Sequence, residues 1–293
     1  MDGRDEFRDF LTSRRARITP ELAGLPAYGG GNRRVPGLRR EEVALLAGVS
    51  VEYYTRLERG NARGVSESVL DNLARALQLD DAERAHLFDL ARSANTGASR
   101  PRRPPKQQVR PIVQRILDGM DGIPAHVRNG RFESLAVNRM GRALLAPVFE
   151  GRQPPVSLVR FVFLDPRAED FYGDWERTAN DMVAALRTEA GRNPYDKALT
   201  DLIGELSTRS DFFRTRWAAH NVRFHNAGVK VFHHPVVGEL RLTYESLELT
   251  DGTGLMMSVY SAEPGTPSQE KMALLASWAA TVEREQADSH PTI

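Results

Sequence analysis

Residues 39–61, RREEVALLAGVSVEYYTRLERGN, constrain the fold of this 293-residue chain more than any other segment. The pattern predicts a short helix over Glu41–Ala47 that ends at Gly48, because glycine readily adopts the positive φ of a helix terminus. Ser50 is a favourable N-cap for a second helix over Val51–Arg59. Two short helices joined by so tight a turn indicate a helix-turn-helix unit.

A helix-turn-helix unit places the N-terminal end of its second helix in the major groove of DNA. The chemistry of the segment fits that role, because Arg56 can donate paired hydrogen bonds to the O6 and N7 atoms of guanine. From Arg14 to Arg63 the chain has 10 arginines against 5 acidic residues, which suits contact with phosphates. The alternative interpretation is an amphipathic helix pair in a protein-interaction domain.

The residues around this motif predict a small all-α domain over residues 1–92, with no strand. Within the second helix, Tyr54 and Leu57 are three positions apart and are expected to face the core. Apolar residues recur at helical spacing in five stretches, which are 7–18, 38–47, 50–59, 66–77 and 80–91.

A proline- and arginine-rich segment, 93–106, predicts a linker, and residues 107–293 then form a second domain. Two strand-like runs flank Asn129-Gly130, a strong hairpin signal. Three more strand-like runs follow a set of helices, at 229–233, 239–249 and 254–260, and a last helix opens at Pro267. We expect an α+β domain with an antiparallel sheet and helices on one face.

The composition excludes several classes of protein. The chain has no cysteine, which rules out disulfides, thiolate zinc sites and cysteine nucleophiles. No apolar run approaches the roughly 20 residues of a membrane-spanning helix, and the charged N-terminus lacks a signal-peptide core. We therefore expect a cytoplasmic protein that does not contact the membrane. The spacing of His220, His225 and His233-His234 does not indicate a metal site, and no motif argues for a cofactor or an enzyme.

The pattern E-x-V-A-x-x-A-G-V-S followed by Y-Y-x-R-L-E-R-G resembles the Cro/C1 (XRE) class of helix-turn-helix repressors. The resemblance covers residues 1–92 and implies a five-helix DNA-binding domain that binds an operator as a homodimer. The long stretch 18–37 departs from the class, and its role stays open. The residues at positions that face the groove in this class are Ser50, Val51, Glu52, Tyr53 and Arg56. The resemblance places Arg40 where the class contacts phosphate or base, and Asn61 and Arg63 where contacts to the DNA backbone are usual.

The second domain resembles the C-terminal domain of MmyB-like regulators in four segments, which are 131–145, 159–175, 212–223 and 233–249. The resemblance implies a PAS-like fold with a long apolar cavity, for which fatty acids are proposed ligands. A fatty acid needs an apolar tunnel and one cationic or hydrogen-bonding end. The candidate carboxylate partners are Arg160, His220, Arg223 and Tyr260, and the candidate wall residues are Trp175 and Trp217. Any one of them can equally be a core aromatic or part of a structural ion pair.

These observations favour a DNA-binding transcriptional regulator that senses a small apolar ligand. One alternative is a regulator that binds DNA or RNA polymerase and whose second domain only dimerises. Another is an enzyme, for which Tyr260, His220 and Glu245 are the candidate acid-base residues. The sequence leaves open the native ligand, the operator, and whether binding represses or activates.

Overall fold

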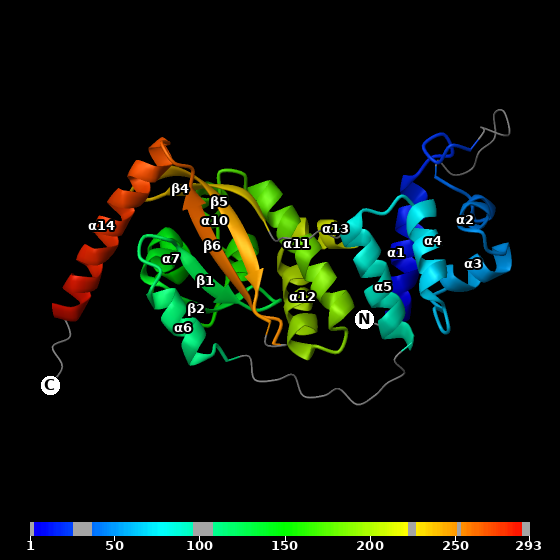
Figure 1. Ribbon diagram of the computed structural model, residues 1–293, viewed down its shortest axis with the longest axis horizontal. Helices are drawn as coiled ribbons and strands as arrows, with labels where there is room; N and C mark the ends of the chain where they lie inside the picture. The colour runs from blue at the N-terminus through cyan, green and yellow to red at the C-terminus, as the bar shows by residue number, and fades with distance from the viewer. Residues whose placement is uncertain (1–2, 26–36, 96–107, 222–226, 251–252, 289–293) are drawn as a thin grey trace. The chain divides into compact units, whose positions relative to one another are not determined.

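The computed structural model describes residues 3–25, 37–95, 108–221, 227–250 and 253–288, coloured in Figure 1. The chain divides into two compact units, each discontinuous in sequence. Unit 1 comprises Met1–Arg103, Val183–Ser207 and Arg214–Phe224, and unit 2 comprises Pro104–Met182, Thr208–Phe213 and His225–Ile293. Parts of the predicted second domain, 107–293, therefore cluster with the helix-turn-helix, whereas the predicted linker lies almost wholly outside the described residues.

The described part of residues 1–95 folds into five helices and no strand, which confirms the expected all-α region. Phe7, Tyr54 and Leu73, from three of these helices, share one core and are fully buried. The helices are α1 (Gly3–Arg17), α2 (Arg40–Ala47), α3 (Val51–Glu58), α4 (Glu67–Ala76) and α5 (Asp81–Asn95). Most of the stretch 18–37, whose role the sequence left open, lies outside the described residues.

Three further helices contribute to unit 1. They are α11 (Trp175–Arg192), of which residues 183–192 belong to this unit, α12 (Lys197–Arg209) and α13 (Asp211–Ala218). The sequence predicts helices in all three places. It does not reveal that they join the N-terminal core, because the contacts link residues more than 100 positions apart.

Unit 2 is built on a six-stranded antiparallel sheet with the order β3-β2-β1-β6-β5-β4, which confirms the predicted α+β class (Figure 1). The strands are β1 (Ala125–Arg128), β2 (Glu133–Val137), β3 (Val156–Ser157), β4 (Ala227–His234), β5 (Gly238–Glu248) and β6 (Met256–Ala262). The sequence missed β3 because a strand of two residues carries no periodic pattern.

The loop between β1 and β2 is longer than the two-residue turn that Asn129-Gly130 suggests. The Asn129 amide donates to the Glu133 carbonyl oxygen, and the Asn129 side-chain oxygen accepts from the amides of Arg131 and Glu133. Phe132 adopts the left-handed φ of 57° within this loop. The side chain of Asn129 therefore stabilises the hairpin through hydrogen bonds and not through an αL turn of its own.

Helices pack on both faces of this sheet, so the expectation of helices on one face is only partly right. One face of the sheet bears Phe232, His234 and Tyr260. On this face the ring of Phe171 packs against Phe232, and the ring of Phe161 packs against Phe171. Val113 and Leu117 pack on the opposite face. The helices of unit 2 are α6 (Pro111–Asp118), α7 (Arg139–Leu144), α8 (Ala146–Phe149), α9 (Leu158–Leu164), α10 (Arg167–Phe171) and α14 (Pro267–Asp288).

Gly60 provides a test of the N-terminal packing, because it has a φ of 84° and lies against the backbone of Arg4. An added Cβ would overlap the Arg4 carbonyl oxygen. Gly64 has a similar φ of 72° and open space around it. Both Gly60→Ala and Gly64→Ala should lose about 1–2 kcal/mol to left-handed backbone strain. Only Gly60→Ala should show an additional loss in urea denaturation, and equal losses would contradict this packing.

Candidate functional site

The turn between α2 and α3 has the geometry that the sequence predicts. Gly48 ends α2 with a φ of 66°, and its left-handed backbone lets the chain reverse. Val49 is half-buried against the core. The hydroxyl of Ser50 then accepts a hydrogen bond from the Tyr53 amide at 3.1 Å and caps α3. The start of α3 is therefore fixed by local chemistry.

A buried carboxylate holds α3 against two other helices. The side chain of Glu58, only 1% exposed, accepts from Arg15 of α1 at 2.5 Å and forms an ion pair with Arg40 of α2. The Tyr54 hydroxyl lies 3.4 Å from the same carboxylate, and burial raises the pKa of that phenol above its usual value. The sequence marked Arg40 as a DNA contact. Its guanidinium is half-exposed while it pairs with Glu58, so a phosphate can still reach it.

The outward face of α3 is a continuous strip of side chains. Arg56 lies over the ring of Tyr53 with 4.6 Å between the guanidinium carbon and the ring centroid. Tyr53 is half-buried against the core, so this stacking restricts where the guanidinium can point. A shallow depression on this face is lined by Val51, Glu52, Thr55, Arg56, Arg59 and Asn61.

Two residues of this strip, Thr55 and Arg59, were not among the sequence-predicted contacts. They lie three and seven positions after Glu52, and residues at that spacing share one face of a helix. This spacing in the sequence would have predicted that both residues share the face of Glu52. Beyond the helix, Asn61 is exposed and its side-chain oxygen accepts from the amide of Arg63 at 3.3 Å.

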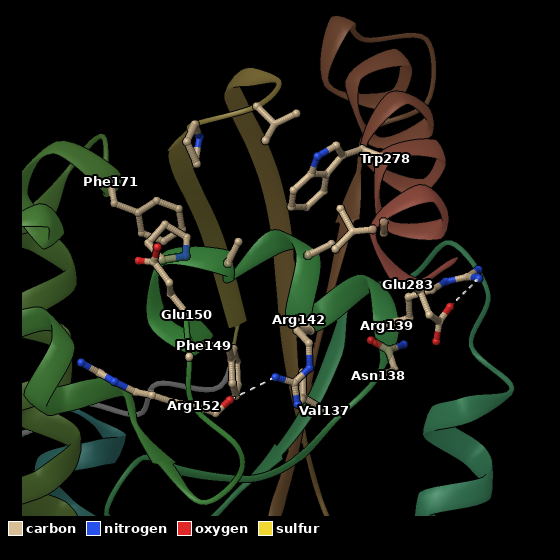
Figure 2. Close-up of a pocket in the computed structure, with 18 of the residues that line it drawn as sticks. Val137, Asn138, Arg139, Arg142, Phe149, Glu150, Arg152, Phe171, Trp278 and Glu283 are labelled. Atoms are coloured by element: carbon tan, nitrogen blue, oxygen red, sulfur yellow. Dashed lines mark hydrogen bonds and ion pairs between the residues drawn. The ribbon is translucent and has the colours of Figure 1, made fainter. Parts of the chain in front are cut away.

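Unit 2 contains an open groove with a volume of about 1360 Å³ (Figure 2). Its apolar lining includes Phe149, Phe171 and Trp278. Four arginines line it too; Arg152 is exposed, and the other three have partners. Arg139 pairs with Asp121 and Glu283 at 3.6 and 3.7 Å, Arg142 donates to the Arg152 carbonyl oxygen, and Arg167 pairs with Asp165 and Glu150.

The face of the sheet that carries Phe232 is buried and unusually polar. Four adjacent strands each place a polar side chain on it, namely His126 (β1), Tyr260 (β6), Tyr244 (β5) and Lys230 (β4). The rings of His126 and Tyr260 stack with their centroids 6.2 Å apart, and those of Tyr260 and Tyr244 lie 6.1 Å apart. We call these residues, together with Tyr172, the buried polar cluster.

Two family models match the chain. Residues 109–275 match the MmyB-like transcription regulator ligand binding domain, and residues 6–87 match a helix-turn-helix domain. The chain belongs to the MmyB-like transcription regulators. The first domain implies DNA binding and the second a small-molecule ligand. No curated protein matches the chain.

In this MmyB-like regulator, two of the sequence-predicted ligand residues belong to unit 1. The ring of Trp217 lies 4.0 Å below the guanidinium carbon of Arg187, and the Nδ1 atom of His220 is 3.0 Å from a nitrogen of Arg187. Arg187 also pairs with Glu6, and Arg14 donates to the His220 carbonyl oxygen. Burial lowers the pKa of His220 to about 4, so this ring stays neutral at pH 7. These residues form a structural network.

The remaining ligand candidates lie apart from one another. Arg160 is exposed on α9, and the Trp175 indole donates to the Val162 carbonyl oxygen at 2.9 Å. Arg223 lies outside the described residues. Only Tyr260 belongs to the buried polar cluster, and none of the described candidates lines the groove. Glu245, proposed as a catalytic partner of Tyr260, is exposed on the opposite face of the sheet.

Glu58→Gln tests how strongly the buried carboxylate fixes α3. The change leaves the guanidinium of Arg15, 14% exposed, without its counter-charge. We expect the unfolding free energy to fall by about 2–3 kcal/mol. This loss is smaller than the full cost of an unpaired buried charge, because the second partner, Arg40, is half-exposed and stays solvated. Urea denaturation followed by circular dichroism measures the loss. Glu52→Gln, on the exposed side of α3, is the matched control and should stay within about 0.5 kcal/mol of wild type. Similar stabilities for the two variants would refute this role of Glu58.

Proposed function

We propose that this protein is a sequence-specific DNA-binding transcriptional regulator whose second domain senses a small apolar ligand, with a fatty acid as the candidate. One observation carries the DNA-reading half of the proposal. The face of α3 that bears Val51, Glu52 and Arg56 is exposed, while Glu58 on the other side of the helix is buried and fixed. A reading helix needs this combination of an exposed face and a rigid back.

Each side chain of this face has a chemistry suited to the major groove. Arg56 can donate two hydrogen bonds to guanine, and Val51 can contact a thymine methyl group. Glu52 can accept from cytosine N4 or disfavour other bases. The exposed Ser50, which caps α3, and the half-buried Tyr53 complete the proposed set of base or phosphate contacts.

Phosphate contacts would position this helix on the duplex. We assign them to Arg40, Asn61 and Arg63, and add Arg59 because it shares the exposed face. Arg40 would make its contact while still held by Glu58, so α2 and α3 would dock as one body. Two copies of the chain, as a homodimer in the cytoplasm, would bind an operator with two half-sites.

The ligand half of the proposal rests on the MmyB-like domain and on the apolar interior of unit 2. Rings of Phe161, Phe171 and Phe232 pack together beside the sheet, and Phe171 also lines the open groove. An apolar chain can bury its surface against such rings. Binding would then shift the protein between states that differ in DNA affinity.

Arg56→Ala and Arg63→Ala separate base reading from phosphate contact. Arg56→Ala should weaken binding by about 1–3 kcal/mol and relax the preference at one base position. Arg63→Ala should weaken binding evenly across sequences and reduce the salt slope by about one. Selection from a randomised duplex pool, followed by titrations at several salt concentrations, measures both effects. If Arg56→Ala leaves affinity and base preference unchanged, Arg56 does not read DNA. If wild-type affinity hardly changes with salt, the N-terminal domain binds a protein partner.

Native mass spectrometry of the purified protein tests the ligand. We expect a non-covalent adduct with the mass of a fatty acid, lost when the same sample is denatured, and a dimer in the native spectrum. Delipidated protein to which dodecanoate is added should regain an adduct. A monomer would refute the proposed dimer. An unchanged mass both as purified and after addition of fatty acids would leave the second domain with the alternative role of a dimerisation block.

A further inference from the structure

Lys230 is a buried cation with no counter-ion at bonding distance among the residues that the structure describes. Its side chain belongs to the inward face of β4, and the residue is only 9% exposed. Its ammonium nitrogen lies 5.1 Å from the ring centroid of Tyr244 and 5.8 Å from that of Tyr172. Within the described part of the chain it has no hydrogen bond and no ion pair, and Asp181 influences it only from a distance. Lysines are almost never buried in this way unless they are paired.

Two buried arginines of unit 1 are paired in the ordinary way, whereas Arg128 of β1, which is also buried, lies over the ring of Phe132 and lowers the pKa of Lys230. Arg14 pairs with Glu83 and Arg187 pairs with Glu6. Of the arginines that line the groove, Arg139, Arg142 and Arg167 also have carboxylate or carbonyl partners, and Arg152 is exposed. Burial lowers the pKa of Lys230 to about 8, which still leaves most of the side chain charged at pH 7. The interior of unit 2 therefore holds a positive charge that no described residue neutralises at contact distance.

The buried polar cluster also holds neutral polar groups that have no partner among the described residues. The Nδ1 atom of His126 is fully buried and has no hydrogen-bond partner in the described part of the chain, and burial lowers the pKa of this ring to about 3. The hydroxyls of Tyr172 and Tyr260 form no hydrogen bond with any residue that the structure describes, although both residues are at least nine-tenths buried. Burial raises the pKa of each phenol, so both remain protonated and able to donate. Leaving buried polar groups unpaired costs about 1–3 kcal/mol each.

We propose that the buried polar cluster binds the carboxylate of an apolar-chain ligand, with Lys230 supplying the charge and the hydroxyls of Tyr172 and Tyr260 donating hydrogen bonds. This inference rests on the proposed ligand-sensing function and adds which residues hold the charged end of the ligand and select it over an uncharged chain. One carboxylate satisfies a cation and two hydroxyl donors together, since it carries one negative charge and two acceptor oxygens.

The surroundings of the cluster suit the chain of such a ligand. Phe171 lies between the cluster and the groove, because its ring is 5.0 Å from that of Tyr172 and also lines the groove. A chain that leaves Lys230 past Phe171 would reach the apolar lining of the groove, where Phe149 and Trp278 lie (Figure 2). The charged end and the chain would then occupy different parts of unit 2.

Calorimetry on the delipidated full-length protein tests this assignment with two probes, dodecanoate and 1-dodecanol, which share a chain and differ in charge. Wild type should bind dodecanoate about ten- to a hundredfold more tightly than the alcohol. Lys230→Met should remove this preference and leave binding of the alcohol within about threefold of wild type. Lys271→Met is the matched control, because Lys271 is half-buried on α14 and donates to the Glu239 carbonyl oxygen. It should keep the preference.

A stability measurement separates a ligand contact from a structural role. Lys230→Met without ligand should melt at or above the temperature of wild type, because the change removes an unpaired buried charge. Tyr260→Phe should fold and should lower affinity for dodecanoate several-fold. A preference for dodecanoate that survives Lys230→Met would overturn this inference alone. Equal binding of both probes by wild type would also overturn it, while the ligand-sensing function would stand. Failure of wild type to bind either probe would overturn both.

Discussion

The carboxylate of Glu58 is the interaction on which the proposed DNA-reading geometry depends. It is buried among α1, α2 and α3, and it takes one arginine from each of the first two helices. An ion pair in such a place adds little net stability, but breaking it is expensive, so it selects one arrangement of the three helices. Because Glu58 is on the inner side of α3, the opposite side is presented to solvent as one strip. The proposed DNA reading requires this arrangement.

Lys230 is also a buried charge, but unlike those of unit 1 it has no ion pair among the described residues. In unit 1, the buried charges of Glu58, Arg14 and Arg187 are neutralised by residues of the chain itself, and they fix a structure. In unit 2, the ammonium of Lys230 faces aromatic rings and has no ion pair among the described residues. A protein that must respond to a ligand needs an interaction that the ligand alone completes. An internal counter-ion would remove that dependence.

Local chemistry made much of this structure predictable. Gly48, Ser50 and the periodicity of α3 follow from rules that act over a few residues, and the last helix begins at Pro267 as predicted. The sequence could not reveal that Trp217 and His220 belong to a structural network and not to a ligand site. Trp217 bonds Arg187, 30 positions away, and His220 bonds Arg14, 206 positions away. Lys230 was missed for the same reason. On a strand it looks like an ordinary polar residue, and only the fold shows that it is buried.

The most direct test of the whole account is the affinity of the delipidated protein for its selected operator, measured without ligand and with saturating dodecanoate. The account predicts that the Kd for DNA changes by at least about fivefold, and that operator DNA changes the affinity for dodecanoate by the same factor. Lys230→Met should bind DNA and show no such change. A Kd that is identical with and without bound ligand would mean that the second domain does not control α3, and would contradict the central claim.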